Sequence, residues 1–385
     1  MIMSDIYDIF ILGGGINGAG IARDAAGRGL KICLADKGEI GGATSSWSTK
    51  LIHGGLRYLE NYEFKLVRES LKEREVIHQI ANQITKPIPF IIPHTKNHRP
   101  KWLIEIGLFL YDNLGGKTVI PKSKSIDLKK EFSKILKSEY TIGFQYYDLQ
   151  VDDKKLAKLN AQDAIKNNAR IIEHNEVINI ELIDDYWKIF LEDGLIIKSK
   201  IFINASGPWI NETMKNLIKT DSSKKIRLVK GSHIITKKLY EKNIAFTLQN
   251  DDGRIVFVIP YKEKFSLIGT TEVEVNSPDD NQIDEFEKNY LIDCVNKYFL
   301  KQVNKNHIVD TYSGIRPLIE DFKEASKVTR DYIFDLNTKN NLPILSIYGG
   351  KLTTYRKLSE KALEELSQFL PDNIDKSWTD KKKLI

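Results

Sequence analysis

The sequence predicts an α/β protein in which a domain built on parallel βαβ units is interleaved with a second, mainly antiparallel α+β domain. The chain of 385 residues is long enough for two domains. It opens on a complete βαβ pattern, and later segments alternate between buried apolar strands and meanders of alternating polarity. Because no internal repeat or low-complexity linker separates these segments, we expect the chain to cross between the domains several times.

The opening pattern consists of a strand, a helix, a second strand and an acid. Ile9–Leu12 and Ile32–Ala35 are short and apolar, as buried parallel strands are. Ile16–Arg28 has the Ala-rich, apolar-striped composition of a helix. Asp36 directly follows the second strand. A carboxylate at this point, about 20 residues beyond the glycine loop, can accept the hydroxyls of a ribose.

The loop between the first strand and the helix has the G-x-G-x-x-G spacing. Gly13 lets the chain turn sharply, Gly15 leaves room for a pyrophosphate at the helix N-terminus, and Gly18 lets helix and strand pack closely. The spacing alone is weak evidence. Since the strand, the helix, the second strand and the acid accompany it, the whole unit predicts an ADP-containing dinucleotide.

Composition excludes several other classes of protein. Hydrophobic residues make up 41% and charged residues 29% of the chain, and the net charge is +6. The charge comes with heavy use of Lys, Ile and Asn and with no nucleic-acid-binding motif, so nucleic acid is not expected as a partner. Cys33 and Cys294 are too few for a disulfide framework or a cysteine-ligated cluster, and both are expected to be buried thiols. No metal ligands are predicted.

The remaining elements suit the interleaved fold. We expect helices at Phe64–Ile80, Leu156–Asn167 and Ile283–Leu300. A meander is expected over residues 178–197 after a short strand at Arg170–Ile172. Strands of the second domain are expected at Leu228–Thr236, Arg254–Pro260 and Phe265–Thr271. The chain is expected to return to the first domain at Ile201–Trp209, at Thr311–Leu318 and at Leu345–Gly350.

HGGLRYLE and GGKLTTYRKL are the most distinctive stretches of the chain. Others occur in a consistent order from about residue 5 to about residue 380, namely GGGINGAGIARDAAGRGL, RPKWLIEIGLFLYD, NASGPW, LVKGSHII, RIVFVIPY, IGTTEVE and TYSGIRPL. With them, the sequence resembles the FAD-dependent, quinone-linked (aerobic) glycerol-3-phosphate dehydrogenases of the D-amino-acid-oxidase-like flavoprotein family.

The resemblance implies a discontinuous, Rossmann-like FAD-binding domain of residues 1–80, 145–225 and 305–385. Residues 81–144 and 226–304 then form the substrate- and membrane-facing domain. The helical C-terminal cap domain of the family has no counterpart in this sequence, which stops after Trp378–Ile385. We therefore expect dimer contacts, and part of the membrane or quinone surface, to differ from those of the family.

A dinucleotide loop so close to the N-terminus favours a flavin enzyme, because nothing ahead of it could serve as a catalytic domain. Residues 41–60 are dense in small and hydroxyl side chains, which can run close beside a flat cofactor. With the resemblance, this predicts FAD held without a covalent bond. The predicted FAD contacts are Gly13, Gly15, Asn17, Gly18, Asp36, Thr44, Ser45, Ser46, Lys50, Leu51, His53, Gly54, Gly55, Ala205, Gly207, Gly314, Gly350, Leu352 and Thr353.

A second strand-to-helix turn lies near the end of the chain. A strand ends in Gly349-Gly350 and a helix is expected from Thr353 to Leu370. Its N-terminus would direct free N–H groups at the flavin edge that becomes anionic on reduction; an ordinary connection is the alternative. Lys351 at this turn is either a solvated lysine or a cation aimed at the substrate, and the resemblance favours the second.

The resemblance implies sn-glycerol 3-phosphate as the substrate, oxidised at carbon 2 to dihydroxyacetone phosphate. Arg57 and Lys351 are the predicted phosphate cations, with Tyr58 as a supporting donor. Arg316 is a predicted catalytic residue and would hold the carbon-2 oxygen or the phosphate, because guanidinium groups suit bidentate oxyanion contacts. Thr270 is a weaker substrate contact.

His233 is the predicted general base, because the unperturbed pKa of histidine lies near working pH. A single histidine in a strand is more often structural, and the resemblance reverses that balance. His53 is the competing candidate.

The apolar segment Trp102–Leu114 is too short to span a bilayer and is interrupted by Glu105 and Asp112. Between residues 85 and 124 it is flanked by seven Lys or Arg against two acids. The segment either contacts a membrane surface or packs on the second domain. The resemblance favours the first, with quinone as electron acceptor, a peripheral location on the cytoplasmic face of the inner membrane, and a homodimer as the assembly. No signal peptide is predicted.

Two alternative functions stay open. The protein could keep the chemistry and change its partners, as a glycerol-3-phosphate oxidase using oxygen or as a 2-hydroxy-acid dehydrogenase. Alternatively, it could bind flavin without catalysis and act as a partner module.

Overall fold

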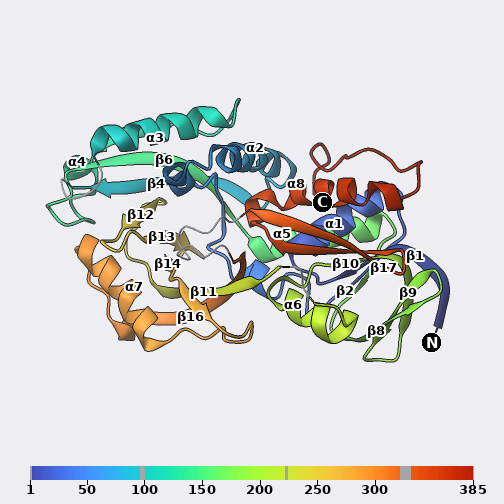
Figure 1. Cartoon of the computed structure of the whole chain (residues 1–385). Helices are drawn as coiled ribbons and strands as arrows, with labels where there is room; N and C mark the ends of the chain where they lie inside the picture. The colour runs from blue at the N-terminus through green and yellow to red at the C-terminus, as the bar shows by residue number, and fades with distance from the viewer. Residues whose placement is uncertain (1, 96–99, 222–223, 321–330, 385) are drawn as a thin grey trace.

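The computed structural model describes residues 2–95, 100–221, 224–320 and 331–384. Two β-sheets form its framework, one in each half of the molecule (Figure 1). The first sheet has the order β17 (Tyr332–Lys339), β18 (Leu342–Gly349), β10 (Ile196–Asn204), β1 (Ile2–Leu12), β2 (Ile32–Ala35) and β7 (Arg170–Ile172), and β9 (Tyr186–Leu191) and β8 (Val177–Ile183) extend from β10.

Neighbouring strands from β18 to β7 are parallel, as in a nucleotide-binding domain. Side chains of β1 alternate between the two faces of the sheet, because successive Cβ atoms of a strand point to opposite sides. Ile9 and Ile11 pack against the helical layer, whereas Phe10 packs toward Trp187 of the meander. The helical layer consists of α1 (Ile16–Gly27), α5 (Asp153–Lys166) and α8 (Tyr355–Glu365).

The second sheet is antiparallel except where β12 pairs with β4. Its order is β15 (Val273–Val275), β11 (Ile226–Lys237), β14 (Phe265–Gly269), β13 (Ile255–Tyr261), β12 (Ala245–Gln249), β4 (Thr85–His94), β6 (Ile142–Val151) and β3 (Leu51–Ile52), with β16 (Ile308–Ile319) on β11 and β5 (Lys124–Asp127) on β6. The two faces of this sheet are covered by α7 (Glu285–Tyr298) with α4 (Leu128–Phe132), and by α2 (Phe64–Ile80) with α3 (Lys101–Leu114).

Short helical turns fill the connections. They are η1 (Thr44–Ser46), η2 (Leu56–Asn61), η3 (Gly207–Trp209), α6 (Ile210–Thr213), η4 (Met214–Ile218), η5 (Lys305–His307), η6 (Leu352–Thr354) and η7 (Ser367–Phe369). The α/β class and the interleaving predicted from the sequence are confirmed.

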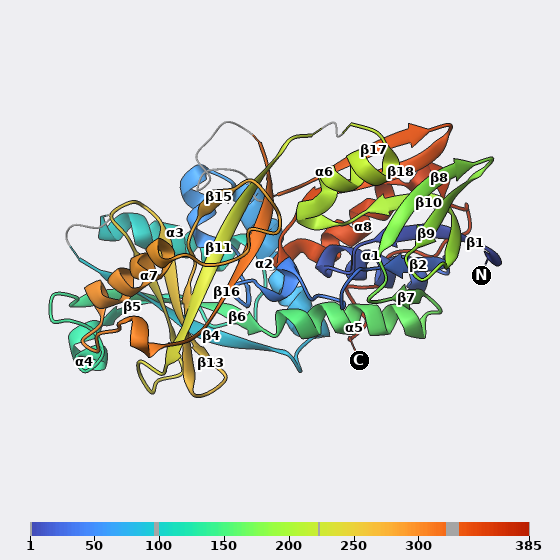
Figure 2. The same cartoon turned by 90° about the horizontal axis from the view of Figure 1, so that it is seen from below.

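The crossings between the domains differ in detail from the predicted ones. β16 pairs with β11 from Ile226 to Thr236, so residues 308–319 belong to the second sheet although the prediction assigned them to the first domain. Figure 2 shows these two long strands running side by side toward the first domain. The strands expected at residues 195–197 and 201–209 form one strand, β10, which pairs with the meander on one side and with the parallel core on the other.

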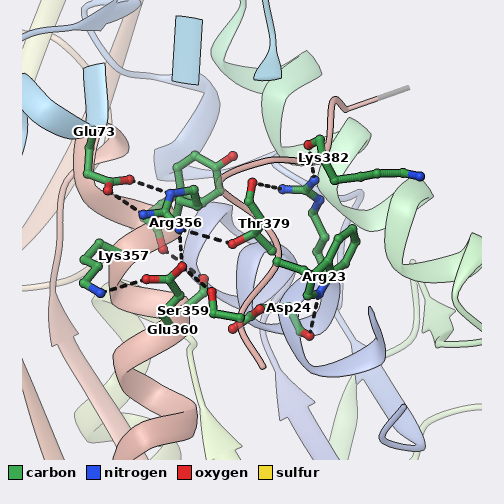
Figure 3. Close-up of polar contacts among 12 residues, drawn as sticks. Arg23, Asp24, Glu73, Arg356, Lys357, Ser359, Glu360, Thr379 and Lys382 are labelled. Carbon is green, nitrogen blue, oxygen red and sulfur yellow. Dashed lines mark hydrogen bonds and ion pairs between the residues drawn. The ribbon is translucent and has the colours of Figure 1, made fainter. Parts of the chain in front are cut away.

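The C-terminal segment lies against the helical layer of the first domain (Figure 3). Arg356 of α8 binds both carboxylate oxygens of Glu73 at 2.6 and 2.8 Å and also pairs with Glu360. Arg23 of α1 binds Asp163 and donates to the Lys382 carbonyl. These groups are buried, so each charge is paired inside the protein, as a buried charge must be.

Helix α3 fully buries two of its side chains and exposes several large apolar ones. Leu108 and Tyr111 are its buried residues, whereas Trp102, Ile106 and Phe109 are 49–66% exposed. In the segment 85–124, lysines 86, 101, 117, 122 and 124 are exposed; Lys96 and Arg99 lie outside the described residues. No helix in the described ranges is long and apolar enough to cross a bilayer.

Candidate active site

A cavity of about 1000 Å³ lies where the two sheets meet. Its walls come from the carboxyl ends of β1, β10 and β18, from the segment that follows β2, and from β4, β6, β12, β13 and β16 of the second sheet. Ligands bind at the carboxyl ends of strands in open α/β sheets. The volume is at the upper end of the range for small-molecule sites, which suits a dinucleotide together with a small substrate.

The glycine loop is shaped by close backbone contacts. Gly13 has a φ of +105°, and a Cβ there would lie 2.5 Å from the Ala205 oxygen. A Cβ on Gly18 would lie 1.9 Å from the Gly13 oxygen, so each position accepts only glycine. The N-terminus of α1 opens into the cavity at Gly15, which has no side-chain cap, while Ser45 Oγ accepts from Ile16 N at 2.8 Å.

Asp36 lies on the cavity wall beyond β2, where the ribose was expected. Its Oδ2 accepts from Gly14 N at 2.6 Å and its Oδ1 accepts from Gly38 N at 2.8 Å. A carboxylate has about four acceptor positions, so ribose hydroxyls can still bind. Asp36 therefore shapes the loop in addition to any cofactor contact.

Asn17 has a buried side-chain oxygen whose hydrogen bonding bears on whether the cavity holds a cofactor. Its Nδ2 donates to the Gly349 oxygen at 3.2 Å and so joins α1 to the turn after β18. Its Oδ1 is buried on the cavity wall and accepts no hydrogen bond within the described residues. Such an atom is costly unless a bound group donates to it. With the glycine loop and the open end of α1, this fits a dinucleotide.

The segment after β2 lies between the two sheets. Thr44 Oγ1 donates to the Ile315 oxygen, and His53 N donates to Thr353 Oγ1, which donates back to the His53 oxygen. His53 thus lies beside η6, which precedes α8. The predicted helix from Thr353 to Leu370 is a 3₁₀ turn followed by the shorter α8.

Most predicted site residues line this one cavity, from both domains. The predicted FAD contacts on its wall are Gly13, Gly15, Asn17, Asp36, Thr44, Ser45, Leu51, His53, Gly55, Ala205, Gly207, Gly314, Gly350, Leu352 and Thr353, and the substrate contacts there are Arg57, Tyr58, Thr270, Arg316 and Lys351. Five predicted residues are not on the wall, namely Gly18, Ser46, Lys50, Gly54 and His233.

Lys50 has a structural partner away from the wall. Its Nζ lies 2.8 Å from Asp153 Oδ1 and 2.9 Å from the Ser46 oxygen. Both Lys50 and Asp153 are largely buried, so the ammonium compensates a buried carboxylate and fixes the loop. Lys50 and Ser46 therefore contact each other rather than the cavity.

Lys351 and Tyr58 form one cationic corner of the cavity. Lys351 Nζ lies 4.5 Å from the centre of the Tyr58 ring and donates to Ser70 Oγ at 3.1 Å. Arg57, next to Tyr58 on η2, lines the same wall. These contacts orient the Lys351 ammonium at the cavity, where it can bind an anionic group.

Arg316 and Thr270 come together across β11. Arg316 donates to Thr270 Oγ1 at 3.0 Å. A Cβ on Gly231 would lie 2.3 Å from the Arg316 guanidinium and 2.6 Å from Thr270 Oγ1. Glycine at position 231 therefore provides the space in which the two side chains meet.

His233 is placed differently from the prediction. It is 1% exposed, stacks on Tyr312, and lies behind Thr49, whose Oγ1 is 3.1 Å from His233 Nε2. Burial, together with Arg316 and Lys50, holds the pKa of His233 well below its ordinary value. His233 is therefore not among the residues that line the cavity, and the sequence could not indicate which way its ring points.

The cavity also has residues that sequence reasoning missed. They include Trp47, Ser48, Thr49, Ile92, Tyr146, Asp148, Trp209, Thr247, Gln249, Phe257 and Glu272. Tyr146 and Asp148 alternate along β6, and Thr247 and Gln249 alternate along β12, so one face of the second sheet carries polar groups into the cavity. That alternation was the signal available in the sequence.

The fold and the cavity together define a dinucleotide-binding α/β protein with a site between two domains. The family model of FAD dependent oxidoreductases matches residues 8–356, and the chain belongs to that family. FAD is its cofactor, and the prediction of an FAD-dependent family from the sequence motifs is confirmed.

Similar proteins agree with this assignment. The chain is 46% identical to a glycerol-3-phosphate dehydrogenase of Pseudomonas tolaasii, over 99% of this chain and 75% of the relative. It is 44% identical to an aerobic glycerol-3-phosphate dehydrogenase of Escherichia coli strain K12, with 97% and 75% covered. It is 43% identical to a D-erythritol 1-phosphate dehydrogenase of Brucella abortus strain 2308, with 97% and 76% covered.

Solved structures share the fold. A glycerol-3-phosphate dehydrogenase of Bacillus halodurans, complexed with FAD, superposes with a TM-score of 0.77 at 24% identity and covers 99% of this chain and 68% of its own. An L-alpha-glycerophosphate oxidase of Mycoplasma pneumoniae with FAD bound gives a TM-score of 0.76 at 17% identity, with 99% of both chains covered.

Proposed function

We propose that the protein oxidises sn-glycerol 3-phosphate to dihydroxyacetone phosphate with FAD. The main support for this proposal is that three cations, Arg57, Lys351 and Arg316, line the same cavity as the dinucleotide-binding loop. Cations on the wall of such a cavity suit a phosphate monoester. The names of relatives 44–46% identical over nearly the whole chain support the same substrate.

When bound, FAD supplies the acceptor for the hydride that leaves carbon 2, at its N5 atom. The protein's own residues bind the phosphate and the carbon-2 oxygen of the substrate. Lys351 and Arg57 hold the phosphate, with Tyr58 as a further donor. Arg316, positioned by Thr270, binds the carbon-2 oxygen as the hydroxyl becomes a carbonyl.

The hydroxyl proton needs an acceptor as the hydride leaves. We propose that it passes to His233 through Thr49: the substrate hydroxyl donates to Thr49 Oγ1 while Thr49 donates to His233 Nε2. The 3.1 Å contact and the position of Thr49 on the wall support this relay. The lowered pKa keeps the His233 ring neutral and therefore able to accept.

A larger polyol phosphate is the second candidate substrate. The D-erythritol 1-phosphate dehydrogenase of Brucella abortus matches this chain about as well as the glycerol-3-phosphate dehydrogenases do. The polar wall of Thr247 and Gln249 could bind an additional hydroxyl. A 2-hydroxy acid has no phosphate for Arg57 and Lys351 to bind.

Quinone is the electron acceptor that we propose, with the reaction taking place at the cytoplasmic surface of a membrane. Helix α3 supports this, because it exposes Trp102, Ile106 and Phe109 and is flanked in the sequence by exposed lysines. An apolar helix face with basic neighbours binds at the surface of anionic lipid. The homodimer stays a prediction.

Anaerobic flavin reduction tests the proposal. The purified holoenzyme is mixed with glycerol 3-phosphate, D-erythritol 1-phosphate or a 2-hydroxy acid, and the flavin absorbance is followed. We expect fast bleaching with glycerol 3-phosphate and none with the hydroxy acid. Reoxidation by a short-chain quinone should be faster than reoxidation by oxygen; the reverse order would make the protein an oxidase. An unbleached flavin with every substrate would contradict catalysis altogether.

A further inference from the structure

Asp148 of β6 is a buried carboxylate on the cavity wall that the proposed reaction does not use. It is 3% exposed. The other carboxylates on the wall, within the described residues, are more exposed. A carboxylate in such a place is costly unless hydrogen bonds compensate it, and it is therefore a candidate for a function.

The hydrogen bonds of Asp148 all end on one oxygen. Oδ1 accepts from the Tyr111 hydroxyl at 2.7 Å, from Arg74 at 2.9 Å and from Gly54 N at 3.4 Å. Oδ2 accepts no hydrogen bond within the described part of the chain, and it is not among the buried atoms without a partner. Because Asp148 lines the cavity, Oδ2 is the oxygen left to meet a ligand there.

Helix α2 fixes this carboxylate relative to the cationic corner. Ser70 holds Lys351, and Arg74, one turn further along the helix, holds Asp148. One turn of an α-helix rises by about 5.4 Å. The Lys351 cation and the Asp148 carboxylate, which both line the cavity, are thus held by neighbouring turns of one helix.

We infer that Asp148 Oδ2 accepts a hydrogen bond from the substrate hydroxyl at the end opposite the phosphate. The inference rests on the proposed function and deepens it, because it makes the site selective for a phosphate at one end of a polyol and a hydroxyl at the other. For glycerol 3-phosphate this is the carbon-1 hydroxyl. Asp148 then repels a phosphate, so the substrate binds in one direction.

An analogue without that hydroxyl tests the inference. The kcat/KM of glycerol 3-phosphate is compared with that of propane-1,2-diol 1-phosphate, in which a methyl group replaces the hydroxymethyl group. In the wild type we expect a ratio of about 10 to 100, since a hydrogen bond to a charged group contributes roughly that much. In Asp148→Asn the ratio should fall about 10-fold, because the carboxylate that distinguishes the two compounds has lost its charge.

Asp163→Asn is the matched control, because it makes the same change in a buried Arg–Asp pair off the cavity wall. Its ratio should equal that of the wild type. An unchanged ratio in Asp148→Asn would overturn the inference, as would an equal loss with both substrates, which is the behaviour of a general base. A wild-type ratio near 1 would overturn it even if the variant failed to fold. A wild type inactive with both compounds would instead overturn the proposed function on which the inference rests.

Discussion

At the scale of single residues, the site depends on glycines whose missing side chains leave space for larger neighbouring side chains. Gly231 lets Arg316 and Thr270 meet above β11, and Gly269 lies against the His233 ring, where a Cβ would be 2.1 Å from the imidazole. On β11, Gly231 thus makes room for Arg316 at the cavity wall, whereas the His233 ring packs against Gly269 of β14 and is not on the wall. This is why Arg316 and His233, both predicted as catalytic, have different surroundings.

The cations give the first prediction. Arg316→Ala and Lys351→Ala should each lose about 100-fold or more in kcat/KM, because a charge-assisted contact to an oxyanion or phosphate is removed from the site. Both variants should keep FAD, measured by flavin absorbance per protein. Lys200→Ala is the control, since Lys200 pairs with Asp8 on the surface. Unchanged kcat/KM in both variants would remove these residues from the site.

The relay gives the second prediction. His233→Gln and Thr49→Val should each slow flavin reduction by about 10²–10⁴-fold, and the double variant should be no slower than the worse single one. The pKa of His233 is well below 6.5, so the ring is neutral above that pH. The wild-type rate should therefore be flat from pH 6.5 to 8 and fall only as the pH drops through the lowered pKa. A rate-controlling group that titrates near neutral pH and disappears in His233→Gln would contradict this placement.

At the scale of elements, α2 connects the parts of the site. Its inward face offers Ser70 to Lys351, Glu73 to Arg356 and Arg74 to Asp148. Ser70 and Arg74 are four residues apart and therefore lie on one face. One helix thus orients a cation of the cavity, a carboxylate of the cavity and the helix that follows η6.

Helix α3 gives the third prediction. Phe109→Glu should weaken binding to anionic phospholipid vesicles by at least about 10-fold, because burying a large apolar side chain contributes about 1.5–3 kcal/mol and the new charge is repelled. Sedimentation with vesicles measures the effect. Phe286→Glu is the matched control, since Phe286 is 76% exposed on α7, which covers the other face of the second sheet. Equal loss in both variants, or none in either, would dismiss α3 as the contact.

At the scale of the whole molecule, two sheets that share one cavity are joined by buried charges as well as by apolar contacts. The pair Arg356–Glu73 links α8 of the first domain to α2, and Thr379 and Lys382 of the C-terminal segment bind Arg356 and Arg23 (Figure 3). Leu384 is buried in the same core.

That network gives the fourth prediction. Arg356→Met should lower the free energy of unfolding by about 3–5 kcal/mol, because Glu73 and Glu360 would keep buried charges without their partner. Urea denaturation measures the loss. Removing the exposed partner in Lys305→Ala should cost about 1 kcal/mol or less, since surface ion pairs contribute little. A loss for Arg356→Met as small as this control would contradict the role of the network.

The cofactor gives the fifth prediction. The purified protein should be yellow, and acid or heat should release intact FAD. Added FAD at about 100 times its Kd should raise the stability of the apoprotein by about 2.7 kcal/mol, because only the folded cavity binds it. Thermal denaturation with and without FAD measures the shift. Flavin that stays with the denatured chain would indicate a covalent bond, and finding NAD alone would contradict the family chemistry.

The sequence by itself determined the features that depend on local pattern. The glycine spacing, the alternation of buried strands and the helix stripe predicted the α/β class, and the resemblance of the motifs to a flavoprotein family predicted FAD. The bounds of α2, β2 and β7 agree with those read from residue pattern alone. Such features follow from short-range sterics and periodicity, which one segment carries in full.

Only the tertiary structure decided which side chains face the cavity. His233 and Asp148 are both buried polar residues of strands, yet Asp148 reaches the wall and His233 lies behind Thr49. β16 belongs to the second sheet because its backbone groups pair with β11, which no local pattern in β16 could indicate. Which side chains of a strand face the cavity depends on the pairing register of the strand and on the elements that cover the sheet. Residues distant in sequence determine both.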